Sequence, residues 1–289
     1  MIKNIILTII FCCLFINIDA TSFFQNYNKN NLIINNSNIL QPTTPRSLSE
    51  EEKKYVAHAG GQLEDYTYLN NLESIRNSYN KGVRLIELDV ELTTDNVPIM
   101  LHSWDGFITK FFGVEAWKKY SSEEFNNFQM VNEWHQLTLD DTIKYMEEEF
   151  KEMYLITDTK NDNIFLLNTL VSKYPHMMYR IIPQVYNQEE YKYAKDLGFE
   201  NIIYTLYMSE DTQEEIIEFC KQNNPFAITM NTYWAYTNLP AELAKLDIYT
   251  YAHTINTVQE FETLKNKGIN GVYTDNLFEY WITFIWLLT

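Results

Sequence analysis

Three carboxylates alternate with apolar residues in the stretch LIELDVEL, residues 85–92. Glu87, Asp89 and Glu91 would lie on one face of a β-strand, because successive side chains of a strand point to opposite faces. A half-buried strand with a solvated acidic side shows this alternation, and so does a strand that presents carboxylates to a metal ion. The alternation alone leaves both interpretations open.

Residues suited to acid–base chemistry end several other predicted strands. His58 and His102 follow the first and third strands, and Asp158 and Lys160 end the fourth. Carboxylates that converge on one point repel one another unless a divalent cation lies between them, and an all-oxygen ligand set favours Mg²⁺ or Ca²⁺ over zinc. Two histidines near phosphorus would act as general base and general acid, because the ordinary histidine pKa lies near neutrality. With a lysine that holds a phosphate oxygen, the set predicts metal-assisted attack on a phosphodiester.

Short strand-like runs alternate with helix-like segments after residue 50, which predicts a parallel sheet and, over this length, a (β/α)8 TIM barrel. An open doubly wound sheet is the alternative. The connection at residues 93–96 is too short for a parallel crossover, so one run is expected to be an extension or an extra antiparallel strand. The nine runs are residues 54–60, 85–92, 98–103, 153–160, 180–186, 201–207, 226–231, 248–254 and 271–275.

Polar residues also end the later predicted strands. In (β/α)8 enzymes the active site lies at the carboxyl ends of the strands, which makes these residues candidates for substrate contact. The three that we expect to bind substrate are Gln184, Tyr207 and His253. Comparable positions are held by Thr205, Asn231, Asn256 and Asp275.

Four motifs resemble the glycerophosphodiester phosphodiesterase family. They are HAGG at residues 58–61, NNLESI at 70–75, IELDVELTTDNVPIMLHSWD at 86–105 and YTD at 273–275. The resemblance covers about residues 54–280 in motif order. The HAGG opening is similar to the branch often grouped with phosphatidylinositol-specific phospholipase C-like enzymes, which share the barrel.

The resemblance implies catalytic and metal-binding roles. His58 matches the histidine of the family's His-Arg-Gly opening and His102 that of its His-Asp motif, so they would form the catalytic pair. Glu87 and Asp89 match the metal-binding acids of its Ile-Glu-x-Asp-Val motif. Asp158 matches the acid of a Glu-x-Lys motif and would be the third ligand of one divalent cation, Mg²⁺ or Ca²⁺.

The same matches imply contacts with substrate. Lys160 matches the lysine of Glu-x-Lys and would contact phosphate, and Asn70 matches the asparagine of Pro-Glu-Asn-Thr. Glu91 falls at the variable position of its motif and would be a bystander. The implied activity is a metal-dependent phosphoric diester hydrolase acting on glycerophosphodiesters or phospholipid head groups.

Four departures from the family pattern bear on the substrate. Ala59 replaces the opening arginine, Leu69 an acid, Ser103 the aspartate of His-Asp, and His253 a usual aromatic residue. They put the glycerol-headed substrate in question and leave the metal and histidine machinery intact. The sphingomyelinase D-like phospholipases, which also lack the acid at the Leu69 position and form a cyclic phosphate, are one alternative. A non-catalytic barrel that binds phospho-ligands is another.

The composition and net charge limit which molecules the protein can bind. The net charge is −17 and the pI about 4.7, so the chain would repel nucleic acid, and a phosphate-handling enzyme with this surface needs a cation or a local positive cluster. Cys220 is the single cysteine after residue 20, which excludes an intramolecular disulfide in a processed chain and predicts a buried helix residue. The oligomeric state stays open.

The two ends of the sequence carry further expectations. Lys3 precedes an apolar run at residues 5–16 that is too short to span a bilayer, which predicts a signal peptide at residues 1–20 and a secreted or extracytoplasmic protein, or alternatively an uncleaved membrane anchor. An Asn-rich disordered linker would occupy residues 21–50 and one barrel domain residues 51–289. The apolar end, residues 278–289, predicts a last barrel helix or a tail in peripheral contact with a membrane.

Overall fold

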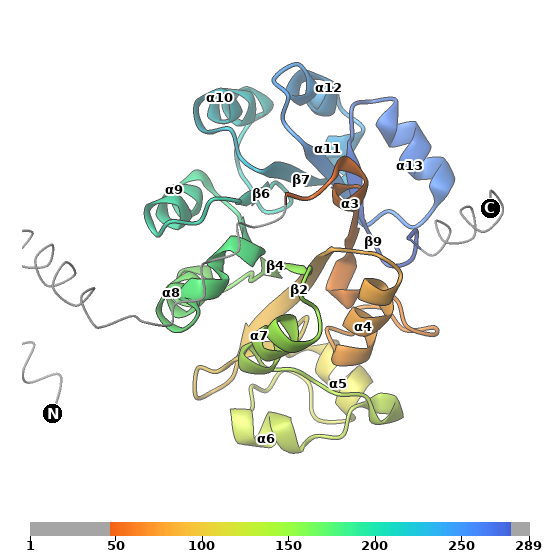
Figure 1. Cartoon of the computed structure of the whole chain (residues 1–289), viewed down its shortest axis with the longest axis vertical. Helices are drawn as coiled ribbons and strands as arrows, with labels where there is room; N and C mark the ends of the chain where they lie inside the picture. The colour runs from red at the N-terminus through yellow and green to blue at the C-terminus, as the bar shows by residue number, and fades with distance from the viewer. Residues whose placement is uncertain (1–46, 279–289) are drawn as a thin grey trace, which may run out of the picture. The chain divides into compact units, whose positions relative to one another are not determined.

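Eight parallel strands close into a barrel in the computed structural model, which describes residues 47–278. β1 pairs with both β9 and β2, and this pairing closes the sheet. The predicted (β/α)8 barrel is confirmed, and the open doubly wound sheet is excluded (Figure 1). The barrel strands are β1 (Tyr55–Ala57), β2 (Leu85–Leu92), β4 (Tyr154–Asp158), β5 (Ile181–Val185), β6 (Ile203–Thr205), β7 (Ala227–Asn231), β8 (Thr250–His253) and β9 (Gly271–Thr274).

Helices connect the strands and surround the barrel (Figure 1). Their starts are encoded locally: Thr138 and Asp141 form a reciprocal capping box at α7, and Thr212 and Glu215 form one at α10, which satisfies N–H groups that a first helical turn leaves free. The longer helices are α4 (Leu72–Asn80), α7 (Leu139–Glu148), α8 (Asn163–Lys173), α9 (Gln188–Asp196), α10 (Gln213–Asn223) and α13 (Val258–Lys265). The shorter ones are α3 (Glu50–Lys53), α5 (Gly106–Phe112), α6 (Ser122–Asn127), α11 (Thr232–Ala235), α12 (Leu239–Ala244) and the 3-10 turns η1 (His58–Gly60), η2 (Val131–Glu133) and η3 (Pro175–Arg180).

β3 (Pro98–Met100) accounts for the ninth predicted strand. It runs antiparallel to β2, with Val90 opposite Met100, so the extra antiparallel strand expected from the short connection is confirmed. The chain then runs back along β2, where the Leu101 N–H donates to the carbonyl of Asp89. His102 therefore reaches the carboxyl half of β2 through this hairpin and not at the end of a barrel strand.

The segment between β3 and α7 forms a small layer of its own. It contains α5 and α6, which the sequence did not predict and which lie together beyond α7 (Figure 1). Its apolar side chains form a separate cluster, consisting of Ile99, Leu101, Trp104, Ile108, Tyr120 and Phe125. The layer carries the residues that follow His102, so it supports one edge of the site described below.

Alternation along the strands separates two apolar layers. On β2, Ile86, Leu88 and Val90 point outward into the layer beneath the helices, whereas Leu85 points into the lumen. The lumen is filled by Val56, Leu85, Tyr154, Ile156, Ile182, Ile203, Ala227, Tyr251 and Tyr273. Since each barrel strand contributes to this lumen cluster, the next inward positions toward the carboxyl ends of the strands converge on one another.

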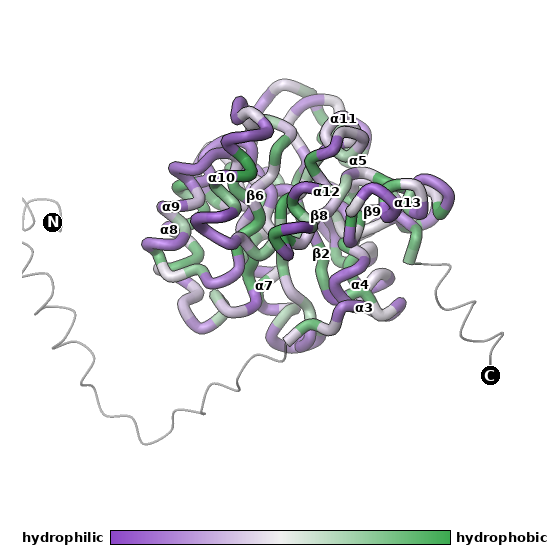
Figure 2. The backbone as a smooth tube through the Cα atoms, turned by 90° about the horizontal axis from the view of Figure 1, so that it is seen from above, coloured by the Kyte–Doolittle hydropathy of each residue, from purple (hydrophilic) through white to green (hydrophobic). Residues whose placement is uncertain are grey.

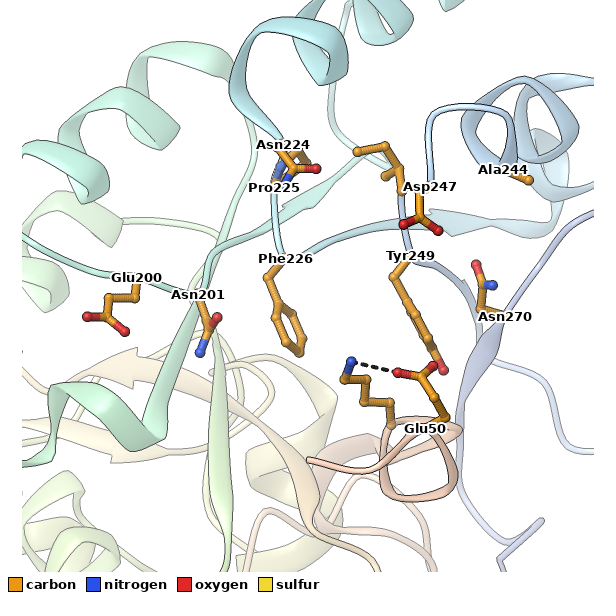
Figure 3. Close-up of a pocket in the computed structure, with 12 residues that line it drawn as sticks. Glu50, Glu200, Asn201, Asn224, Pro225, Phe226, Ala244, Asp247, Tyr249 and Asn270 are labelled. Carbon is orange, nitrogen blue, oxygen red and sulfur yellow. Dashed lines mark hydrogen bonds and ion pairs between the residues drawn. The ribbon is translucent and has the colours of Figure 1, made fainter. Parts of the chain in front are cut away.

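The amino-terminal end of the barrel carries α3, at the end opposite α5 and α11 (Figure 2). Ser49 and Glu52 form a capping box there, and Leu48 packs against the lumen cluster. Leu48 therefore contacts the core of the barrel. A cavity of about 560 Å³ opens at this end between Phe226, Tyr249 and neighbouring residues (Figure 3).

Several predictions fall on residues outside the described part of the chain. The signal peptide at 1–20, most of the linker, and the apolar tail after Phe278 belong to them. Within residues 47–278 no helix combines the length and apolar character needed to cross a membrane. Cys220 lies on α10 and is buried, as predicted, and burial raises the pKa of its thiol to about 12.

Candidate active site

The lumen becomes polar at the carboxyl ends of the strands. Glu87 and Asp89 occupy inward positions of β2, and Asp158 occupies the last inward position of β4. The parallel register of the two strands places Asp89 directly opposite Asp158. One oxygen from each of the three acids lies within 4.8 Å of the other two. The structure thus brings together the three predicted metal ligands.

The donor set of this carboxylate cluster fits a hard divalent cation. Glu87 and Asp89 are only 2% and 3% exposed. Glu87 Oε1 and Asp158 Oδ1 are buried and have no hydrogen-bond partner. Buried polar atoms without partners are costly, and one cation held by the three acids would satisfy both oxygens. Oxygen donors alone suit Mg²⁺ or Ca²⁺.

Burial and mutual repulsion set the charge of the cluster. Burial, reinforced by the charge of Asp89, raises the pKa values of Glu87 and Asp158. Burial also opposes ionisation of Asp89, but Lys160 and the nearby histidines outweigh it and lower the pKa of Asp89. The raised pKa values favour the protonated forms of Glu87 and Asp158, so a cation would compete with protons for these carboxylates.

Two backbone positions with positive φ hold the ligands in place. The Asn70 side chain donates to Asp89 Oδ2 at 2.9 Å and accepts the Asp89 backbone N–H at 2.9 Å. The Ala59 N–H donates to Glu87 Oε2 at 2.7 Å. Asn70 and Ala59 have φ values of 50° and 48°, a conformation that persists only where surrounding contacts support it. Asn70 is 1% exposed and orients a ligand, and its predicted contact with substrate stays a prediction.

Lys160 bridges the cluster and His102. Its Nζ lies 3.2 Å from Asp89 Oδ1 and 3.3 Å from His102 Nε2. Because an ammonium group only donates hydrogen bonds, His102 Nε2 accepts and the ring hydrogen lies on Nδ1. Burial lowers the pKa of His102 and Lys160 lowers it further, against the opposing effect of Asp89. The lowered pKa favours the neutral ring, whose Nε2 lone pair accepts from Lys160.

His58 faces the cluster from η1 and pairs with Asp275. Its Nδ1 lies 2.9 Å from Asp275 Oδ1, and the Asn256 side chain holds the other carboxylate oxygen at 2.6 Å. Burial alone would lower the pKa of His58. The hydrogen bond to Asp275 and the charges of the acid cluster outweigh burial and raise that pKa to about 9. The environment of His58 therefore favours the imidazolium form.

A narrow cavity of about 30 Å³ lies among these groups, with room for one or two water molecules or an ion. Its walls include the predicted substrate residues Gln184, Tyr207 and His253. The Tyr273 hydroxyl donates to Gln184 Oε1 at 2.8 Å, whereas His253 Nε2 is buried without a partner. Burial, with a smaller effect of His58, lowers the pKa of His253 to about 4. Every site residue predicted from the sequence lies at the cluster or the cavity.

Sequence reasoning missed two features of the site. The Tyr68 ring packs against both histidines, with its centroid 4.7 Å from His58 and 4.9 Å from His102. Tyr68 lies in a loop, and its own backbone has a φ of 62°. The sequence gives no signal for this conformation. Asp275 stood among the strand-end polar residues, but its pairing with His58 follows only from barrel closure, which makes β9 the neighbour of β1.

The sequence of residues 61–278 matches the family model described as the glycerophosphoryl diester phosphodiesterase family. The chain belongs to this family. It is accordingly an enzyme of the phosphoric diester hydrolase type. Three of the four predicted motifs fall inside the match, and the HAGG motif with His58 begins three residues before it. No curated protein matches the chain in sequence.

Solved glycerophosphodiester phosphodiesterases share the fold. One from Parabacteroides distasonis is 15% identical, with a TM-score of 0.63 and coverage of 78% of this chain and 84% of the other. A phosphodiesterase from Oleispira antarctica is 16% identical, with a TM-score of 0.63 and coverage of 78% and 94%. The enzyme from Thermotoga maritima is 18% identical, with a TM-score of 0.60 and coverage of 80% and 97%.

The departures from the glycerophosphodiester phosphodiesterase pattern lie around the carboxylate cluster. Ala59 contributes its backbone N–H to Glu87, as described above. Leu69 is 3% exposed and belongs to an apolar cluster, so no fourth acid stands at that position. Ser103 lies with its Oγ 3.2 Å from His102 Nδ1. The residues that the resemblance assigns to metal binding and to the histidine pair are present in this chain, and the changes lie beside them.

Proposed function

We propose that the enzyme cleaves glycerophosphodiesters or phospholipid head groups with one divalent cation, Mg²⁺ or Ca²⁺, and an acid–base pair of histidines. The proposal rests mainly on one observation. His58 and His102 both pack against the Tyr68 ring, and they lie beside buried carboxylates that have oxygens without a hydrogen-bond partner. The Oleispira antarctica phosphodiesterase was solved in complex with the product sn-glycerol-3-phosphate, which supports a glycerophosphodiester as substrate.

Glu87, Asp89 and Asp158 would hold the cation, which would supply positive charge to offset negative charge on the phosphate. Lys160 Nζ, which lies between Asp89 and His102, is placed to donate to a non-bridging phosphate oxygen. When Lys160 turns from His102 Nε2 to a phosphate oxygen, the lone pair on Nε2 is released to accept a proton from the attacking hydroxyl. His58 carries a hydrogen on Nδ1 toward Asp275 and, as an imidazolium, gives its Nε2 proton to the leaving oxygen.

The attacking hydroxyl belongs either to water or to the substrate itself. Water gives a phosphomonoester directly. A substrate hydroxyl gives a cyclic phosphate, which is the outcome implied by the sphingomyelinase D-like resemblance. The two products have different phosphorus resonances, so one measurement distinguishes them.

The test follows phosphorus by NMR during incubation with glycerophosphocholine, lysophosphatidylcholine or sphingomyelin, with Mg²⁺, with Ca²⁺ and with chelator. We expect cation-dependent turnover that falls by about 10²–10⁴-fold in His58→Ala and in His102→Ala, the usual contribution of general acid–base catalysis. His176→Ala is the matched control, because His176 is exposed and pairs with Glu147 on the surface. Its turnover should equal that of the unaltered enzyme.

Two results would contradict the proposal. One is turnover that persists in both site variants at the level of His176→Ala. The other is tight binding of phosphate ligands without turnover of any diester, which would indicate a non-catalytic barrel.

We also propose that the protein is exported and that residues 1–20 are removed, on the strength of the apolar run at residues 5–16 after Lys3. Amino-terminal sequencing of the protein isolated from its source should begin near residue 21. A chain that retains Lys3 and partitions with membranes would indicate the uncleaved anchor instead.

A further inference from the structure

His102 has a second ring nitrogen, and the residues beside it form a chain of hydrogen bonds. His102 Nδ1 lies 3.2 Å from Ser103 Oγ, and the Ser103 hydroxyl donates to Asp105 Oδ1 at 2.7 Å. We propose that Ser103 and Asp105 form a relay that positions His102 and fixes which nitrogen carries its hydrogen. The proposal adds two positioning residues to the proposed function and rests on it for the catalytic role of His102.

The direction of each hydrogen bond is determined by its partners. Lys160 donates to Nε2, so Nδ1 is the donor nitrogen of neutral His102. Ser103 Oγ accepts that hydrogen and donates its own to Asp105, because a carboxylate only accepts. Every group then makes the bond that its chemistry allows, and the lone pair that would take a proton points toward the carboxylate cluster.

The far end of the relay is anchored by α5. Asp105 is the N-cap of this helix, and its Oδ1 also accepts the Phe107 N–H at 3.2 Å. The Phe107 ring packs on the His102 ring with centroids 4.2 Å apart. One short segment thus holds the imidazole by its edge and by its face.

The relay brings a carboxylate to His102 although the residue next to His102 is not an acid. The resemblance places an aspartate at residue 103, where this chain has serine. Asp105, two residues after Ser103, is connected to His102 through the Ser103 hydroxyl. A buried or half-buried imidazole with an oriented partner keeps one tautomer, and a wrong tautomer removes the base from its task.

The decisive test reads the tautomer in the resting protein and needs no substrate. Long-range ¹H–¹⁵N correlation of the imidazoles, with the His102 signals identified by their loss in His102→Gln, should show hydrogen on Nδ1. Ser103→Ala should shift the ring toward the Nε2-protonated form, and Ser103→Thr, which keeps the hydroxyl, should restore it. Ser103→Ala with an unchanged Nδ1–H tautomer would overturn the proposal, whether or not any diester is cleaved.

Activity separates positioning from folding. With an active preparation, Ser103→Ala should lower kcat about 10–100-fold at nearly constant KM and thermal midpoint, the usual effect of losing the group that orients a catalytic imidazole. Asp105→Asn should lower kcat similarly, because asparagine still caps α5 and accepts from Ser103 but lacks the charge. Ser103→Thr should lie within about 3-fold of the unaltered enzyme. Equal losses of kcat in Ser103→Ala and Ser103→Thr would refute the relay.

Discussion

Glu91 shares the inward face of β2 with Glu87 and Asp89, yet it lies outside the carboxylate cluster. Glu91 lies opposite Ile99 of β3 in the hairpin. It is two residues further along β2 than Asp89, the last acid of the cluster on that strand. Asp158 comes from another strand and is in register with Asp89. Strand register, more than closeness in sequence, therefore decides which acids can share a cation.

Cation binding should separate Asp158 from Glu91. We expect Asp158→Ala to weaken binding of Mg²⁺ or Mn²⁺ by about 100-fold or more, since loss of an outer-shell partner alone commonly costs about 10–100-fold. Glu91→Ala should stay within about 3-fold, because its carboxylate contributes no ligand. Isothermal titration of the two variants measures both values. Equal weakening would show that the ligand set includes Glu91.

The sequence identified the residues of the site that sit on strands, because strand ends in a barrel meet at one place. It could not find Tyr68 between the two histidines, since that loop residue depends on a left-handed backbone supported by tertiary contacts. It also could not give Asn70 its position on Asp89.

At the scale of elements, Arg180 joins β5 to the end of α7. It is 5% exposed, and its guanidinium donates to the backbone carbonyls of Met146, Phe150 and Met153. These carbonyls belong to the last turn of α7 and the loop that enters β4, where backbone carbonyls lack helical partners, and that of Phe150 also accepts the Met153 N–H. One side chain therefore satisfies the connection that positions the strand carrying Asp158.

Loss of Arg180 should destabilise the barrel strongly. We expect Arg180→Met to lower the free energy of unfolding by about 2–4 kcal/mol, because each buried carbonyl left without a donor costs about 1–3 kcal/mol and water can satisfy part of the loss. Arg76→Met is the matched control: it breaks an exposed ion pair with Glu149 at 2.6 Å, worth about 0–1 kcal/mol. Urea denaturation compares them. Equal losses of unfolding free energy in the two variants would show that the buried hydrogen bonds of Arg180 do not stabilise the barrel.

The regular elements were predictable, and the irregular layer was not. Strands as short as β6 (Ile203–Thr205) were found because their apolar runs recur between helical segments, and the hairpin was found because residues 93–96 allow no crossover. α5 and α6 have too few turns to show a clear apolar period. Their fold depends on the apolar cluster around Trp104 and Phe125, which brings together residues far apart in the sequence.

At the scale of the whole molecule, the site buries carboxylates whose ionisation destabilises the folded state. The net charge is −17, and three of the acids that contribute to it lie together in the carboxylate cluster. The pKa values of Glu87 and Asp158 are raised in the folded protein by burial first and by neighbouring acids next. The folded state therefore holds protons that the unfolded chain releases, and the stability that depends on them is lost as pH rises through the raised pKa values.

Stability and cation binding should consequently depend on pH in opposite directions. His58 has the same sign as the two acids, because its pKa rises to about 9 and its contribution fades as pH climbs from 6.5 toward that value. His253 and His102 have the opposite sign, because burial lowers their pKa values, and they offset part of the decline between about pH 5.5 and pH 6.5. In chelator, we expect a thermal midpoint at about pH 8 that is about 2–6 °C below the midpoint at about pH 5.5. Added cation should raise the midpoint more at the higher pH, because it binds ionised carboxylates.

The variant Asp158→Asn distinguishes the cluster from general surface repulsion. Asparagine cannot ionise, so the cation should no longer raise the midpoint, and the decline with pH in chelator should become smaller by the share that Asp158 contributes. General repulsion among the surface acids would leave that decline unchanged. Differential scanning calorimetry at both pH values, with and without cation, gives all four midpoints for each protein. A cation effect of equal size at both pH values would mean that the carboxylates are already ionised in the metal-free protein.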